Sequence, residues 1–185
     1  MVWEGRLFFR PTAAAAAVPV HEKLAGEPEL RVDVYKPLSA RAGLKLRGNG
    51  GWELKLRVEV DGARGFEKWK KHRCEDEAAA VAKAGEAATS APEVSIEKQR
   101  IRASWVANAL VEQTELRVTC GGATEVWRTV AAEGKRGVCS PLLQQLAPLC
   151  AAQAVDGVTS CGYPQFVCDV AARLRDGGAG GAAVT

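Results

Sequence analysis

The sequence lacks several features that would point directly to a function. No two of its six cysteines have the Cys-x-x-Cys spacing typical of a zinc site, and there are only two histidines, His21 and His72. A disulfide framework is not expected in a chain of 185 residues, which is long enough to bury a sizeable core. We therefore expect reduced thiols, most of them buried as small apolar side chains.

The chain also lacks a long apolar run and a strong net charge. No stretch approaches the ~20 apolar residues of a membrane span. The N-terminal segment MVWEGRLFFR carries charges where a signal peptide needs an apolar run. With 25 basic and 22 acidic residues the net charge is only +3, which argues against bulk nucleic-acid binding. We predict a cytoplasmic protein with no membrane partner and no nucleic-acid partner. Localisation to an organelle and the oligomeric state stay open.

Alternation of apolar and charged residues dominates what is present. In GLKLRGNGGWELKLRVEVDG two alternating runs flank Asn49-Gly50-Gly51, a combination typical of a β-hairpin. The same alternation predicts further strands over residues 3–10, 31–35, 94–105, 113–120 and 125–133. Composition and capping residues predict helices over residues 66–72, 75–88, 141–149 and 163–175.

One face of most predicted strands carries basic residues at its centre, as at Lys45 and Arg47 or at Lys98 and Arg100. In an open antiparallel sheet such a face is simply the one that meets water. If the sheet closes into a barrel, the same faces line one lumen and helices cover the aliphatic outer faces. Buried cations without partners are costly, so a cationic lumen implies either an anionic ligand or wide access to water. Phosphate fits best, because arginine offers a planar fork and lysine a point charge.

We therefore predict an α+β fold with an antiparallel, closed or nearly closed β-barrel (a tunnel) of about seven or eight strands. Helices would surround the barrel, and a C-terminal helical pair would complete it. Residues 1–176 are expected to form a single domain, and residues 177–185 a flexible Gly/Ala tail.

The order of the charged motifs resembles the CYTH domain, the family of triphosphate tunnel metalloenzymes. Asp33-Val34-Tyr35 resembles the D-x-Y landmark of that family, Lys45-Leu46-Arg47 its R-x-R, and Lys98-Gln99-Arg100 its K-x-R. Gly162-Tyr163-Pro164 lies where the last helix of the family begins. The resemblance spans nearly the whole chain and implies a tunnel that binds a triphosphate or polyphosphate anion.

The resemblance also implies roles for individual residues. Catalytic roles are expected for Lys55, Arg57, Lys98 and Arg100. Substrate-binding roles are expected for Arg6, Lys45, Arg47 and Arg117. A Mg²⁺ or Mn²⁺ cofactor would be held by Glu4, Glu53, Glu115 and Glu133.

Three functions are compatible with these patterns. The first is metal-dependent hydrolysis of a triphosphate or short polyphosphate, with the substrate left open. The second is a non-catalytic phosphate-binding module, because Val2 and Arg6 replace the first glutamate and the lysine of the family's E-x-E-x-K strand. The third is an open sheet used for interaction, with Trp69 and the basic run 68–73 contacting RNA or phosphoserine.

Overall fold

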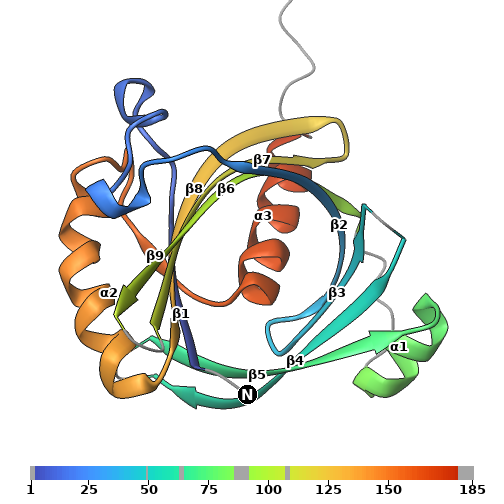
Figure 1. The fold of residues 1–185 in the computed structure, drawn as a ribbon. Coiled ribbons are helices and arrows are strands. Elements are labelled where there is room, and N and C mark those ends of the chain that lie inside the picture. Colours follow the sequence, from blue (N-terminus) through green and yellow to red (C-terminus); the bar gives the residue numbers. More distant parts are fainter. Residues whose placement is uncertain (1–2, 49, 63–64, 86–91, 107–108, 179–185) are drawn as a thin grey trace, which may run out of the picture.

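A computed structural model of the chain describes residues 3–48, 50–62, 65–85, 92–106 and 109–178. Within these residues, eight antiparallel strands follow one another in the order β5-β4-β3-β2-β6-β7-β8-β1, and pairing of β1 with β5 closes the barrel (Figure 1). The strands are β1 (Trp3–Phe9), β2 (Glu29–Ser39), β3 (Ala42–Arg47), β4 (Trp52–Asp61), β5 (Phe66–Cys74), β6 (Val94–Val106), β7 (Ala109–Cys120) and β8 (Ala123–Gly134). The predicted α+β barrel is confirmed, and the open sheet of the third hypothesis is wrong.

The hairpin that dominates the sequence pattern forms β3 and β4. Leu44 lies opposite Leu54 on the outer face, and Lys45 lies opposite Glu53 on the inner face. The register follows from the alternation, because a slip by one residue would exchange the two faces. Asn49 of the predicted turn lies outside the described residues.

Two helices cover the outer face of the barrel on opposite sides (Figure 1). Helix α1 (Glu77–Ala84) packs Ala80 against Leu44 and Leu54, and Asp76 caps its N-terminus by accepting a hydrogen bond from the Ala79 N–H. Helix α2 (Arg136–Ala151) covers β1 with three buried leucines. Gly5 of β1 makes this close approach possible, because a Cβ atom there would lie 2.3 Å from a Leu143 methyl carbon.

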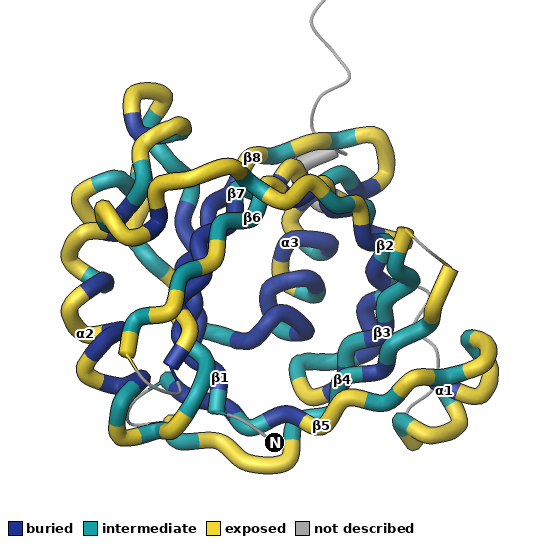
Figure 2. The backbone as a smooth tube through the Cα atoms, in the orientation of Figure 1, coloured by how far each residue is buried: buried dark blue, intermediate teal, exposed yellow. Residues whose placement is uncertain are grey.

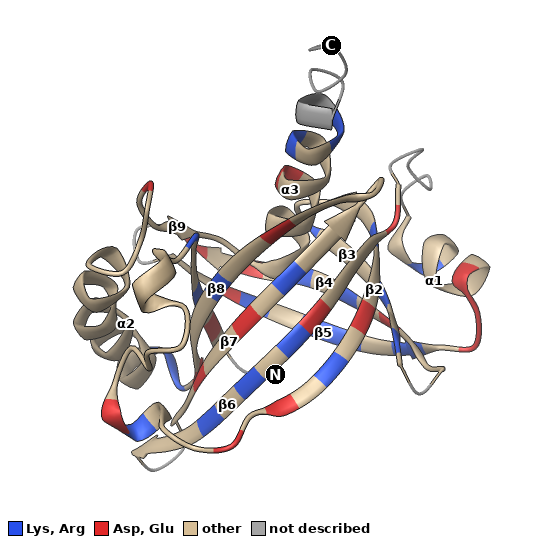
Figure 3. Cartoon of the chain, turned by 90° about the horizontal axis from the view of Figure 1, so that it is seen from above, with Lys and Arg blue, Asp and Glu red and all other residues tan. Residues whose placement is uncertain are grey.

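The last helix, α3 (Tyr163–Gly178), begins inside the ring of strands, where Figure 2 shows its first turns largely buried, and its later turns extend beyond the strands (Figure 3). Phe166 of α3 stacks on Phe8 of β1 with ring centroids 4.0 Å apart. The inner faces of the strands are therefore apolar around α3 and charged toward the other end of the barrel. On β6, for example, Val94 and Ile96 pack in the cluster around α3, whereas Lys98 lines an open cavity.

Three smaller elements complete the described fold. Strand β9 (Thr159–Ser160) pairs with β1 beyond the part of β1 that pairs with β5. Two short 3₁₀ helices, η1 (Ala13–Ala15) and η2 (Glu22–Leu24), lie between β1 and β2. Among the described residues, no helix has both the length and the apolar character that a membrane span requires. The six cysteines are thiols rather than disulfides, and three of them are buried.

The prediction of a helix over residues 66–72 is wrong, because this segment is strand β5. Its residues alternate between faces: Phe66 packs outward with α2, whereas Lys71 lines the cavity. Pairing with both β4 and β1 closes the barrel, and this tertiary contact outweighs the local preference for helix. Trp69 is buried, so it is not an exposed handle for RNA or phosphoserine.

Other boundaries also differ from prediction. Strand β2 continues through Pro37 to Ser39, and α2 begins at Arg136 rather than at Pro141. Of the predicted helix over residues 75–88, α1 covers Glu77–Ala84, and residues 86–88 lie outside the described part of the chain. Residues 179–185 of the predicted tail also lie outside it, and the division of the chain at residue 176 stays a prediction.

Candidate anion-binding cavity

The half of the lumen that α3 leaves open forms a cavity of about 420 Å³. All eight barrel strands and the start of α3 contribute to its lining, which is rich in charged residues. Figure 3 shows how Lys, Arg, Asp and Glu recur along the strands. The ten basic residues are Arg6, Arg31, Lys36, Lys45, Arg47, Lys55, Lys71, Lys98, Arg100 and Arg102. The five acidic residues are Glu4, Glu29, Glu53, Glu112 and Glu133. This surplus of cations in a concave site favours an anion.

Arg6 is the centre of the buried charge network. Its Nε donates to Glu4 at 3.2 Å and its Nη1 to Glu112 at 3.1 Å, while Nη2 lies 3.9 Å from Glu133. The guanidinium also lies over the ring of Tyr163, 4.6 Å from its centroid. Burial opposes the charge of Arg6, but Glu112 and Glu4 outweigh it and raise the pKa of the guanidinium above its ordinary value.

A second cation, Lys55, stabilises the ionised form of Glu4 in addition to Arg6. Lys55 donates to its Oε2 at 2.7 Å and lies over the ring of Trp69. Burial favours the neutral acid, yet Lys55 and Arg6 together keep the pKa of Glu4 far below its ordinary value. Both carboxylate oxygens of Glu4 are therefore bonded to fixed cations.

Lys98 is a second buried cation of the cavity. Its ammonium donates to Asp33 at 3.0 Å and to the Tyr35 hydroxyl at 2.6 Å, and lies 4.3 Å from the ring centroid of Tyr163. Asp33 is completely buried and also faces Lys45 and Arg31. Burial lowers the pKa of Lys98 to about 7, because Asp33 only partly offsets it and Lys45 repels the charged form.

This shift predicts how stability depends on pH. The ordinary pKa of lysine is 10.5, so between pH 7 and pH 10.5 the unfolded chain binds a proton that folded Lys98 does not. The free energy of unfolding should therefore rise from pH 7 to pH 8.5. Burial raises the pKa values of Cys150 and of the partly buried Cys161 to about 12, so above pH 9 these two thiols lower the free energy of unfolding as the pH rises.

Urea denaturation at pH 7.0 and 8.5 measures this slope. In Lys98→Met the rise should be clearly smaller than in the wild-type protein. Lys70→Met removes an exposed lysine from β5 and should leave the slope unchanged. A slope that is the same in all three proteins would contradict the assignment to Lys98.

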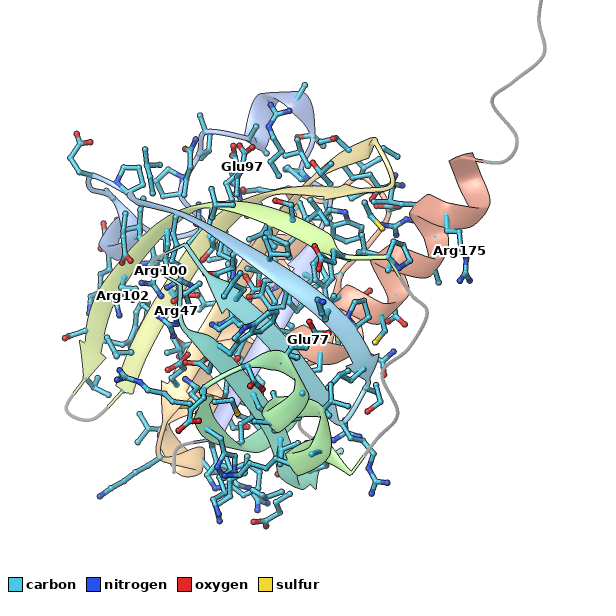
Figure 4. The ribbon with its side chains drawn as sticks, turned by 90° about the vertical axis from the view of Figure 1, so that its right-hand side faces the viewer. Arg47, Glu77, Glu97, Arg100, Arg102 and Arg175 are labelled. Carbon is cyan, nitrogen blue, oxygen red and sulfur yellow. The ribbon has the colours of Figure 1, made fainter. Side chains whose placement is uncertain are left out.

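The rim of the cavity carries a second set of ion pairs. Arg47 donates to Glu53 at 2.8 Å, and Arg100 lies between Glu29 and Glu112. Arg102 lies further out and is half exposed. In Figure 4 Arg47, Arg100 and Arg102 lie near one another at one end of the barrel, and Arg175 of α3 lies at the other. Cations are thus present at several depths of the lumen.

Comparison with known proteins bears on the fold. No protein-family model matches the sequence, and no curated protein matches it. Among solved structures, the PH1819 protein from Pyrococcus horikoshii OT3 has a TM-score of 0.52 at 11% identity, covering 90% of this chain and 99% of that chain. The two chains share a fold. The Mimivirus capping enzyme triphosphatase has a TM-score of 0.47 at 8% identity, covering 80% of this chain and 89% of that chain.

The similarity to PH1819 concerns the fold alone, so membership of the CYTH family stays a prediction. The same holds for the role of each candidate residue, although the structure shows where each one lies.

Nine of the twelve predicted site residues line the cavity. They are Glu4, Arg6, Lys45, Arg47, Glu53, Lys55, Lys98, Arg100 and Glu133. The other three are not part of the lining: Arg57 donates to Glu67 at 2.8 Å, Arg117 is largely exposed near Glu97, and Glu115 faces Arg128. On β7 the inward residues are Leu116 and Val118, because this part of the strand packs around α3.

Sequence reasoning missed several residues of the cavity, among them Glu112, Tyr35 and Lys71. Glu112 lies just before the strand predicted over residues 113–120, and it shares its face of β7 with the apolar Leu116. Lys71 was missed because its strand was predicted as a helix.

The four acids predicted to hold a metal do not converge on an open position. Glu4 and Glu133 flank Arg6, Glu53 is paired with Lys45 and Arg47, and Glu115 lies outside the cavity. Across the described ranges there is no group of three or more His, Cys, Asp or Glu residues arranged to hold a metal ion. The donors present therefore do not fit the predicted Mg²⁺ or Mn²⁺ site.

Proposed function

We propose that the cavity binds the phosphate groups of a triphosphate or linear polyphosphate anion. The observation that carries the proposal is the lining itself, with ten basic and five acidic residues around a single space of about 420 Å³. Mutual repulsion among these cations is relieved when an anion enters. Guanidinium and ammonium groups bind phosphate oxygens through charge-assisted hydrogen bonds.

The depth of the cations favours a chain of phosphates over a single one. Lys98, Arg100 and Arg102 occupy alternate positions of β6, which places their Cα atoms about 6–7 Å apart along the strand. Their side chains are 3%, 15% and 51% exposed, so they lie at increasing distance from the buried end of the cavity. A single orthophosphate can contact only one of these three cations at a time, whereas an oligophosphate is long enough to contact several.

A second candidate function is hydrolysis of a phosphoanhydride in the same cavity. One observation favours it: Glu133 is 29% exposed and its contact with Arg6 is 3.9 Å long. Its carboxylate can therefore accept a proton from an attacking water, while the cations stabilise charge on the phosphate oxygens.

Isothermal titration calorimetry tests the proposal, with tripolyphosphate, pyrophosphate, orthophosphate and citrate as ligands. We expect tripolyphosphate to bind at least tenfold more tightly than orthophosphate or citrate, and more weakly as salt is added. Absence of tripolyphosphate binding at low ionic strength would refute the proposal. Release of orthophosphate, measured in the same samples, distinguishes turnover from binding alone.

A further inference from the structure

Three carboxylates from three adjacent strands surround the guanidinium of Arg6. Glu4 precedes it on β1, and Glu133 of β8 lies directly opposite Glu4. Arg6 and Glu112 of β7 both pair with Ala131, which lies between them on β8. Because Ala131 has only a methyl side chain, Arg6 and Glu112 meet above it, at 3.1 Å.

Each nitrogen of the guanidinium faces a different carboxylate. Nε contacts Glu4 at 3.2 Å, Nη1 contacts Glu112 at 3.1 Å, and Nη2 lies 3.9 Å from Glu133. Arg6 is 4% exposed, so the protein itself holds this cation in place. The space among the three carboxylates is therefore taken by a permanent positive charge.

The remaining oxygens of two of these carboxylates are also engaged. Lys55 bonds the second oxygen of Glu4 at 2.7 Å, and Arg100 bonds the second oxygen of Glu112 at 3.4 Å. A divalent cation would have to displace these bonds and lie close to a fixed guanidinium. Repulsion between a divalent cation and a guanidinium this close in a partly buried site is strong, because little water screens it.

From this arrangement we infer that Arg6 occupies the position a divalent cation would need, and that the cavity binds its oligophosphate free of metal. The inference rests on the proposed function and specifies the ionic form of the ligand. Mg²⁺ bound to the oligophosphate lowers its negative charge, and the three carboxylates around Arg6 already face a cation that the protein supplies. Magnesium therefore competes with the cavity for the anion.

Calorimetric titration of the wild-type protein with tripolyphosphate in EDTA and in excess Mg²⁺ tests this inference. We expect binding in EDTA, weakened at least fivefold by Mg²⁺. Binding that appears only with Mg²⁺ would overturn the inference and leave the proposed function standing. No binding in either buffer would overturn the proposed function and, with it, the inference.

A second measurement examines the carboxylates directly. Electron paramagnetic resonance should detect no stoichiometric Mn²⁺ binding to the wild-type protein or to Arg41→Met, which removes an exposed arginine outside the cavity. Arg6→Met removes the cation that Glu4, Glu112 and Glu133 share, and this variant should bind one Mn²⁺ per chain. Wild-type binding of Mn²⁺, or a folded Arg6→Met that binds none, would contradict the placement of Arg6 in the cation position. If Arg6→Met does not fold, the wild-type titrations decide.

Discussion

Replacing Arg100 by methionine is expected to weaken tripolyphosphate binding by about 10- to 100-fold. A hydrogen bond to a charged group contributes about 1.5–3 kcal/mol, which corresponds to this range. Arg100 lies at the middle depth of the β6 series, between Lys98 and Arg102, and its side chain is 15% exposed. Its removal also leaves Glu112 with one cation fewer, so the carboxylate repels the incoming anion more strongly. Calorimetric titration measures the loss, and circular dichroism confirms that the variant is folded.

Arg117→Met is the matched control for this experiment. It removes the same charge from the strand next to β6, but Arg117 is 59% exposed on the outer face of the barrel. Long-range electrostatics alone should reduce affinity by no more than about twofold at physiological salt. Equal losses in both variants would show that overall charge, not the cavity, attracts the anion. No loss in Arg100→Met would place the binding site elsewhere.

Replacing Phe166 by alanine is expected to lower the free energy of unfolding by about 3–5 kcal/mol, the range for a buried phenylalanine. The ring is 4% exposed, stacks on Phe8 at a centroid distance of 4.0 Å and meets Trp127 edge-on at 5.3 Å. No other element can fill this space, since α3 packs inside a closed ring of strands. Urea denaturation followed by tryptophan fluorescence measures the change.

Gln165→Ala provides the comparison on the same helix. Gln165 is only partly buried, and its side-chain amide bonds Asp169 one turn further on. Its removal should change stability by about 0.5 kcal/mol or less, as at ordinary surface positions. A loss below 1 kcal/mol in Phe166→Ala would mean that α3 is not packed inside the barrel as the structure shows.

Much of the barrel could be predicted from alternation alone. In β3 and β4 the leucines lie on one face and the charged residues on the other. The strand conformation and the register of the hairpin therefore follow from the sequence pattern. The charged face of β6 likewise identified Lys98 and Arg100 as lining residues. In these segments apolar and charged residues alternate with a period of two, so the sequence itself separates the two faces of the strand.

Other parts of the site required long-range contacts. Residues 66–74 have no strong strand signal, and they form β5 because the barrel needs one more strand between β4 and β1. On β7 alternation distinguishes two faces but does not say which one points inward. Leu116 and Val118 point inward because α3 is there, and this packing leaves Arg117 outside.

The sequence by itself determined that charged and aliphatic faces alternate along most strands, since side chains in a strand point to opposite sides with a period of two. Only the tertiary structure decided that α3 fills one end of the lumen, which divides the inner face into an apolar and a charged half. It also decided that Arg6 lies among three carboxylates, because β1 is far in sequence from the β7–β8 hairpin and lies beside it only once β1 pairs with β8 in the folded sheet.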